Sequence, residues 1–154
     1  MKIHKSINAD DVYLDLVAAN LKESLERIAD QLAGALSVPP KLVVDGLLER
    51  EKLGSTSVGH SFAIPHCKLQ GLRRIRVALA RFQEPISFGA SPADMVRFVF
   101  VVLSPPDQPA AHLQVLSQIA RILKREDLRT KLMNAKDAAS VLESIQYVAE
   151  TEGL

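Results

Sequence analysis

The sequence predicts an α/β protein of one domain, in which a mixed β-sheet carries helices on both faces. Apolar residues recur at helical spacing near the start of the chain, strand-like runs rich in valine and phenylalanine occupy the middle, and helical stripes return towards the end. Because helices, strands and helices follow in that order, helices are expected to cover the sheet from two sides. A length of 154 residues is typical of a single domain, so residues 1–154 are assigned to one unit.

Composition and charge exclude several classes of protein. Charged residues make up 24% of the chain and hydrophobic residues 47%, which is ordinary for a soluble domain. A formal net charge of +1 gives no electrostatic case for binding nucleic acid or an anionic membrane. The single cysteine, Cys67, excludes an internal disulfide and suits a reducing compartment. With no signal peptide and no apolar run long enough to span a bilayer, we expect a cytoplasmic protein without membrane insertion.

The first fifty residues predict a short strand and two helices. Residues 12–14 have strand character, after turn-forming residues 8–11. Asn20 is placed to cap the first helix. The apolar stripe of that helix comprises Leu21, Leu25, Ile28, Leu32 and Leu36. A second helix begins at the Pro39-Pro40 pair and is expected to stop near Gly54.

The rest of the chain predicts strands followed by helices. Residues 54–65 read as a loop that runs into a short extended piece, and residues 85–88 as another short extended segment. The strands expected from apolar patterning are residues 76–82 and residues 95–103, the latter buried on both faces. After a proline-rich break at residues 104–109, helices are expected at residues 113–123, 127–134 and 137–149.

His66 is the residue of greatest chemical interest. It follows Pro65, whose ring fixes one backbone angle, and residues 63–64 are apolar enough to anchor the segment in a sheet. A neutral imidazole nitrogen accepts a phosphoryl group at physiological pH, and sheet edges are common ligand sites. Local chemistry alone leaves a surface or packing histidine as the more ordinary interpretation.

Two further residues are suited to binding an anion. His112 lies three residues after Pro109, in the first turn of a predicted helix, where exposed backbone N–H groups favour an anion. A neutral His112 can hold a phosphate or hydrogen-bond His66, although a solvent-facing residue is the ordinary alternative. Arg50 lies near the end of the second predicted helix, and its guanidinium suits bidentate contact with phosphate oxygens. At a helix end, a solvated charge is the ordinary alternative.

The segment after Arg50 is rich in small residues. Ser55, Thr56 and Ser57 are flanked by Gly54 and Gly59 and can present hydroxyl and backbone N–H groups to an oxyanion. The order of residues is not that of a nucleotide-binding Walker loop, because the motif's lysine is missing.

The same region suggests two other chemistries. His60, His66, Cys67 and His112 invite a zinc interpretation, but their spacing matches no standard zinc motif, and the adjacent His66 and Cys67 cannot easily converge on one ion. A Cys67 nucleophile with His112 as its base has no supporting motif. The prediction is therefore a site without a metal.

Residues 51–67 resemble the phosphorylation-site signature of the fructose/mannitol-type enzyme IIA domains of the bacterial phosphoenolpyruvate-dependent phosphotransferase system. The residues that fit are Glu51, Val58-Gly59 and Ala63-Ile64-Pro65-His66-Cys67. Phe62 departs from a usually aliphatic position, and His60 stands where related sequences often carry Asn, which brings His60 into consideration at the site. Residues 50–56 and the segment around His112 follow in the family's order, so the resemblance covers nearly the whole chain. Residues 54–56 and 106–108, with no fused transporter or IIB domain, look most like the nitrogen-regulatory branch.

The resemblance implies a specific chemistry. His66 would accept a phosphoryl group from the phosphohistidine of an HPr-like carrier, and His112 would stabilise that group as the second active-site histidine. Arg50 would neutralise charge, while Ser55 and Thr56 would help to shape the phosphate pocket. The scheme requires no cofactor and no metal.

The resemblance also implies partners. The donor must dock on a shallow surface around His66, to which apolar Phe62 and Leu69 are expected to contribute. The nitrogen-regulatory branch implies a regulated protein, such as a sensor kinase or a potassium transporter. Two alternatives stay open: a sugar-transport component that passes phosphate to a IIB domain, and a regulatory binding module that has lost phosphotransfer.

Overall fold

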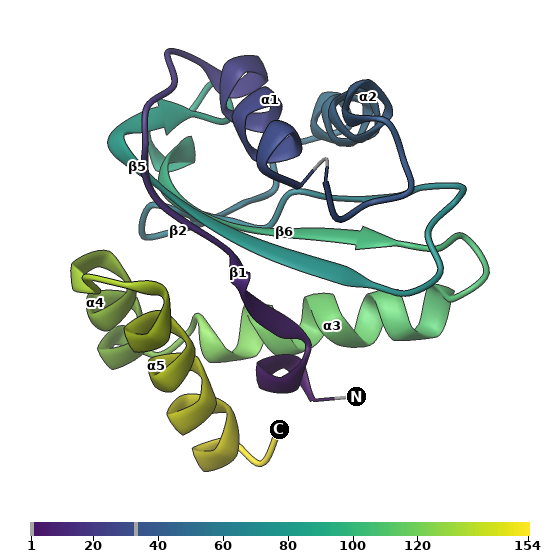
Figure 1. Ribbon diagram of the computed structural model, residues 1–154. Coiled ribbons are helices and arrows are strands. Elements are labelled where there is room, and N and C mark those ends of the chain that lie inside the picture. Colours follow the sequence, from purple (N-terminus) through teal and green to yellow (C-terminus); the bar gives the residue numbers. More distant parts are fainter. Residues whose placement is uncertain (1, 33) are drawn as a thin grey trace.

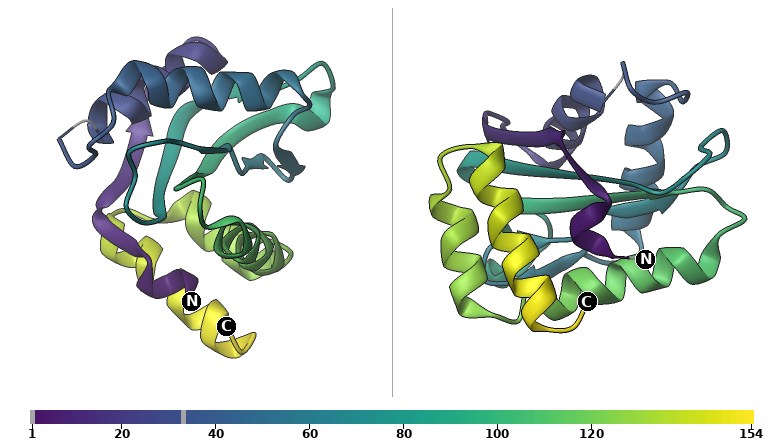
Figure 2. Two further views of the ribbon diagram at one scale, coloured as in Figure 1. Left: turned by 90° about the vertical axis from the view of Figure 1, so that its right-hand side faces the viewer. Right: turned by 60° about the horizontal axis from the view of Figure 1, so that its bottom comes forward.

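A mixed β-sheet separates two layers of helices in the computed structural model, which describes residues 2–32 and 34–154 (Figure 1). One face is covered by α1 (Leu21–Leu32) and α2 (Pro40–Lys52). The other face is covered by α3 (Pro109–Ile122), α4 (Glu126–Asn134) and α5 (Ala138–Thr151), and two further views show the same layers (Figure 2). The predicted α/β class, with helices on both faces of a mixed sheet, is confirmed. Among the described residues, no helix is long and apolar enough to cross a membrane.

Strand β6 is the centre of the sheet. The strands are β1 (Ile7–Leu16), β2 (Ser57–Gly59), β3 (Phe62–Ala63), β4 (His66–Lys68), β5 (Arg76–Ser87) and β6 (Met95–Ser104). Their order is β1-β5-β6-β3-β2, and β4 also pairs with β6. Strands β3 and β4 run parallel to β6, whereas β5 runs antiparallel to it. The segment that carries His66 therefore lies along one side of the central strand. Two 3-10 turns, η1 (Ile3–Lys5) and η2 (Pro92–Asp94), complete the elements.

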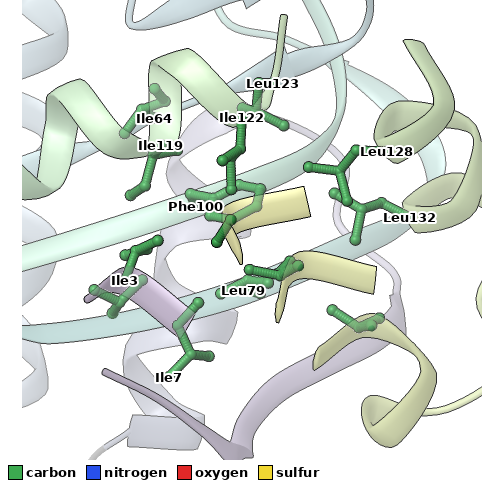
Figure 3. Close-up of a cluster of buried hydrophobic side chains, with 14 of the residues drawn as sticks. Ile3, Ile7, Ile64, Leu79, Phe100, Ile119, Ile122, Leu123, Leu128 and Leu132 are labelled. Atoms are coloured by element: carbon green, nitrogen blue, oxygen red, sulfur yellow. The ribbon is translucent and has the colours of Figure 1, made fainter. Parts of the chain in front are cut away.

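The two faces of the sheet form two apolar cores. Successive side chains of β6 point to opposite faces, and both faces are buried, which explains its unbroken valine and phenylalanine run. Figure 3 shows one core, formed between the sheet and helices α3 and α4. The residues labelled there are Ile3, Ile7, Ile64, Leu79, Phe100, Ile119, Ile122, Leu123, Leu128 and Leu132. Burial of each such large side chain contributes about 1.5–3 kcal/mol. The predicted two-sided burial of the last strand is confirmed.

The first strand is longer than predicted, and the turn expected at residues 8–11 is wrong. Those residues lie within β1, which pairs with β5. Asp11 is buried there because the guanidinium of Arg76 lies 2.8 Å from its carboxylate and the hydroxyl of Tyr13 also donates to it. Desolvation by burial, together with the charge of Asp11, raises the pKa of Tyr13. The burial of Asp11 in β1 is thus compensated by Arg76, which lies much later in the chain.

Other differences concern the ends and the shortest strands. The predicted loop at residues 54–65 contains β2 and β3, joined by a two-residue turn in which His60 and Ser61 have φ angles of 55° and 71°. The extended segment predicted at residues 85–88 continues β5, which ends at Ser87. Helix α1 ends at Leu32, short of Leu36, and the helix after the proline-rich break begins at Pro109.

Candidate active site

The backbone around His66 is fixed from both sides. His66 opens β4 and pairs with Val102 of β6, and the carbonyl of Pro65 accepts a hydrogen bond from the N–H of Val102 at 2.9 Å. One residue earlier, the N–H of Ile64 donates to the carbonyl of Thr56 at 3.0 Å. A half-buried imidazole is therefore held at the margin of the sheet on a backbone with little freedom to move.

The hydrogen bonds of His66 define its tautomer. Its Nδ1 lies 2.7 Å from the carbonyl oxygen of Ile64, and because a carbonyl only accepts, Nδ1 must carry the proton. In the neutral ring, Nε2 then carries the lone pair. The Nε–H of Arg50 donates towards this nitrogen at 3.3 Å. The geometry thus places the lone pair of Nε2 beside the permanent positive charge of Arg50.

Arg50 reaches His66 from the last turn of α2. Its Nη1 donates to the carbonyl of Gly54 at 2.8 Å, just past the end of the helix. With one edge of the guanidinium anchored in this way, its remaining N–H donors are available for an oxyanion bound at Nε2.

A glycine allows α2 to approach β4 this closely. A Cβ atom on Gly46 would lie 3.0 Å from the Sγ of Cys67 and 3.2 Å from Cδ2 of Leu69. Because neighbouring strand residues point to opposite faces, Cys67 packs under α2 while His66 points the other way. Gly46 therefore sets the distance between the helix that carries Arg50 and the strand that carries His66.

His112 comes to the site from the opposite helical layer. Its ring, buried in the first part of α3, has its centroid 5.5 Å from that of the His66 ring, with the two planes inclined at 55°. Its Nδ1 lies 2.6 Å from the Oγ of Ser104, the last residue of β6. Desolvation by burial lowers the pKa of His112, and the charges of His66 and Lys68 lower it further. The structure therefore brings together His66, Arg50 and a predominantly neutral His112.

Ser55 and Thr56 lie in the loop between α2 and β2, and their polar groups bond to residues at the two ends of that loop. Both the backbone N–H and the hydroxyl of Thr56 donate to the carboxylate of Glu51, the former at 3.1 Å. The Oγ of Ser55 accepts from the N–H of Ser57 at 3.1 Å. The loop is thus braced by Glu51 at the end of α2 and by Ser55, and its Gly54 carbonyl holds the guanidinium of Arg50.

Residues 5–148 match the family described as "Phosphoenolpyruvate-dependent sugar phosphotransferase system, EIIA 2". The chain belongs to the EIIA 2 family. A nitrogen regulatory protein of Bradyrhizobium diazoefficiens is 38% identical over 120 residues, which are 78% of each chain. Among solved structures, the nitrogen regulatory protein IIA-Ntr of Neisseria meningitidis superposes with a TM-score of 0.86 at 30% identity, covering 93% of this chain and 98% of the other. The mannitol IIA of Escherichia coli, solved in complex with phosphorylated IIB, gives a TM-score of 0.75 at 26% identity, with 92% and 97% covered.

The comparisons confirm the resemblance read from residues 51–67 and the segment around His112 to this EIIA 2 family. The structure separates His60 from the site, because the turn that carries it lies at the level of Phe98 on β6, whereas His66 lies at Val102. Four strand residues span roughly 13 Å. His60 instead lines a shallow pocket with residues of the far end of α3.

The expected contribution of Phe62 and Leu69 to the docking surface is wrong. Both side chains are buried in the cores of this EIIA 2 domain and present almost no surface to a partner. The exposed apolar side chains that flank the site in sequence are Leu53, 84% exposed after α2, and Leu113, 67% exposed next to His112. Each of these two leucine side chains is open to solvent.

Sequence reasoning missed two contributors: Ser104 contacts His112, and Lys68 places a positive charge near it. Glu51, which fits the signature without an expected role there, braces the loop through Thr56. No local pattern marks Ser104, because its contact depends on how α3 folds back against β6. Burial raises the pKa of the Cys67 thiol to about 12, which leaves it protonated at neutral pH and unsuited to act as a nucleophile. Among the described residues, no group of three or more His, Cys, Asp or Glu side chains is placed to hold a metal ion.

Proposed function

We propose that this protein is a phosphotransferase component that accepts a phosphoryl group on Nε2 of His66 from the phosphohistidine of an HPr-like carrier. One observation carries the proposal: Nδ1 is committed to the carbonyl of Ile64, so the lone pair of the ring lies on Nε2, where it faces the guanidinium of Arg50. A nucleophile beside a cation is the arrangement that phosphoryl transfer requires. Membership of the EIIA 2 family supports the assignment.

The transfer exchanges one nitrogen–phosphorus bond for another. The lone pair of Nε2 attacks phosphorus, the bond to the donor histidine breaks, and that histidine recovers its electron pair. The Nδ1 proton of His66 remains on the bond to Ile64. Since the bond broken and the bond formed are alike, the step is nearly reversible, and the protein contributes position and charge stabilisation. Arg50 and His112 stabilise the phosphoryl oxygens, and the loop of Ser55 and Thr56 forms the wall of the pocket.

The donor docks over the exposed apolar side chains beside the site. Leu53 and Leu113 belong to opposite helical layers and adjoin Arg50 and His112 in sequence. An exposed apolar pair around a reactive group is typical of a transient protein contact. We assign these residues the role that the buried Phe62 and Leu69 cannot fill.

The output we propose is regulation linked to nitrogen, exerted in the cytoplasm on a protein such as a sensor kinase or a potassium transporter. Its support is that the Bradyrhizobium and Neisseria relatives carry the name nitrogen regulatory protein. A phosphoryl group adds roughly two negative charges at neutral pH, enough to create or abolish a contact at the surface between Leu53 and Leu113.

A second candidate output is transfer to a IIB domain, as in sugar transport. It is favoured by the mannitol IIA of E. coli, which was solved in complex with phosphorylated IIB. Mixing the phosphorylated protein with a IIB domain separates the two: rapid loss of phosphate to IIB supports transport, and retention supports regulation.

Phosphate uptake tests the function. The full chain is incubated with phosphoenolpyruvate, enzyme I and an HPr-like carrier, and its intact mass is measured. We expect one phosphoryl group on the wild-type protein and none on His66→Ala. The matched control is His60→Ala, which removes an imidazole away from the site and should be phosphorylated normally. No uptake by the wild type would contradict the function, and uptake by His66→Ala would contradict the site.

A further inference from the structure

Ser104 is a fully buried serine whose hydroxyl lies against the second histidine. It ends β6, and its Oγ is 2.6 Å from Nδ1 of His112. Its backbone is fixed as well, since its carbonyl accepts from the N–H of Leu69 at 2.9 Å and it pairs with Lys68 of β4. Both the side chain and the backbone of Ser104 therefore occupy defined positions beside the site.

The direction of this hydrogen bond follows from the groups available. A hydroxyl has one proton to donate, and a buried hydroxyl that donates to nothing is costly. Within the described part of the chain, Nδ1 of His112 is the partner that the structure gives to the Oγ of Ser104. If the hydroxyl donates to Nδ1, the proton of the neutral imidazole must lie on Nε2. In the reverse direction, Nδ1–H would donate to the Oγ of Ser104. The serine proton would then have no acceptor, and the lone pair of the imidazole would lie on Nε2.

We propose that Ser104 is a positioning residue that keeps His112 in the tautomer with its proton on Nε2, so that this N–H donates to the phosphoryl group on His66. The inference rests on the function proposed above. Nδ1 is occupied by Ser104, so Nε2 is the nitrogen of His112 that remains for the site. A phosphoryl oxygen needs a donor, and the lone pair of the other tautomer would repel it.

The surroundings of His112 favour a neutral ring, in which the choice of tautomer matters. The charged groups near it are cationic, namely Lys68 and the protonated form of His66, and its side chain is buried. A doubly protonated ring would donate from both nitrogens and would need no serine. A neutral ring donates a hydrogen bond from only one nitrogen, and the hydrogen bond from Ser104 to Nδ1 selects Nε2 as that nitrogen.

The tautomer itself is measurable before any phosphate is added. In the ¹⁵N-labelled protein at a pH where His112 is neutral, nitrogen NMR should show the proton on Nε2. Ser104→Ala should lose this preference and give a mixture. The matched control is Ser24→Ala, which removes another fully buried serine hydroxyl, one bonded to the carbonyl of Leu21 in α1, and should leave His112 unchanged. A wild-type ring with its proton on Nδ1 would overturn the inference, whether or not Ser104→Ala folds.

A kinetic cycle then separates positioning from mere structural support. Partners that orient a functional histidine are worth roughly 10–100-fold, so Ser104→Ala should slow phosphorylation about tenfold. His112→Gln supplies an amide N–H at the Nε2 position that needs no tautomer, so adding Ser104→Ala to it should change the rate by less than about twofold. Equal slowing in both backgrounds would overturn the inference. If the wild type takes up no phosphate but holds the Nε2–H tautomer, the proposed function fails while the role of Ser104 in setting the ring stands.

Discussion

At the scale of single residues, the contribution of Arg50 depends on the shape of its guanidinium as well as on its charge. Its Nε faces His66 while its Nη1 holds Gly54, an arrangement that requires a guanidinium fork. Arg50→Lys keeps the charge but cannot make both contacts, so phosphorylation should slow by roughly 10–100-fold without loss of folding. Single-turnover kinetics measure the rate of phosphorylation, and circular dichroism measures folding.

The control is Arg27→Lys, which alters an exposed ion pair with Glu23 on α1 and should change neither the rate nor the folding. A wild-type rate of phosphorylation for Arg50→Lys would show that the two simultaneous contacts of the guanidinium are not required.

His112 should also give the protein a pH-dependent stability. Burial and nearby positive charge lower its pKa from the ordinary 6.5, so the unfolded chain binds this proton first as the pH falls. Stability contributed by His112 is complete above pH 6.5 and declines as the pH drops below it, towards the lowered value. Urea unfolding at pH 7.5 and 5.5 should therefore show a larger loss for the wild type than for His112→Gln. Parallel losses would show that other groups dominate in this range.

At the scale of elements, the contact between α2 and β4 controls the position of Arg50. Gly→Ala in a helix interior ordinarily stabilises by up to about 1 kcal/mol. At Gly46 the added methyl group meets Cys67 and Leu69, and overpacking of this kind costs about 1–3 kcal/mol. Gly46→Ala should therefore destabilise the protein and slow phosphorylation, because α2 must move away from β4. Denaturant unfolding and phosphate uptake measure the two effects.

The rescue variant makes this prediction specific. Cys67→Ala removes the sulfur atom that the new methyl group would meet at 3.0 Å, so the double variant should recover part of both losses. If Gly46→Ala is instead more stable than the wild type, the close approach of helix and strand does not constrain the site.

The elements also show what the sequence could predict. Long segments such as α3 and β6 can be predicted because their buried positions are apolar, and these apolar residues recur with the spacing of a helix or form the continuous run of a strand buried on both faces. Residues 8–11 were misassigned because the acid that looks like turn chemistry, Asp11, is compensated by Arg76 from a distant strand. The motif predicts His66, His112 and Arg50 as site residues, and the structure places their side chains together. Ser104 was missed because its partner is set by packing and no local spacing encodes it.

At the scale of the whole molecule, Arg81 connects the sheet to the C-terminal helices. Its buried guanidinium donates from Nη1 to the carbonyls of Leu132 and Ala135 at 3.0 and 2.7 Å, around the end of α4, and pairs with Asp15 at 3.2 Å. Arg81→Met would leave those carbonyls without their donor, which should cost about 2–4 kcal/mol in urea unfolding. The control is Arg121→Met, on an exposed pair with Glu152, expected to cost less than about 1 kcal/mol. Similar small losses in both would contradict the structural role of Arg81.

The fold as a whole explains why the site lies at one end of β6. Arg50 comes from α2 in one helical layer, His112 from α3 in the other, and His66 from β4 of the sheet between them. Neither layer alone contains the site, so a phosphoryl group carried by His66 as proposed would lie between residues of both helical layers.

The position of the phosphoryl group on the imidazole ring tests the central claim most directly. Phosphorus–nitrogen NMR of the ¹⁵N-labelled, phosphorylated protein identifies both the histidine and the nitrogen that carries phosphorus. The hydrogen bond from Nδ1 to the carbonyl of Ile64 predicts a single product, with phosphorus on Nε2 of His66 and the proton retained on Nδ1. Phosphorus on Nδ1 of His66, or on His112, would contradict the account.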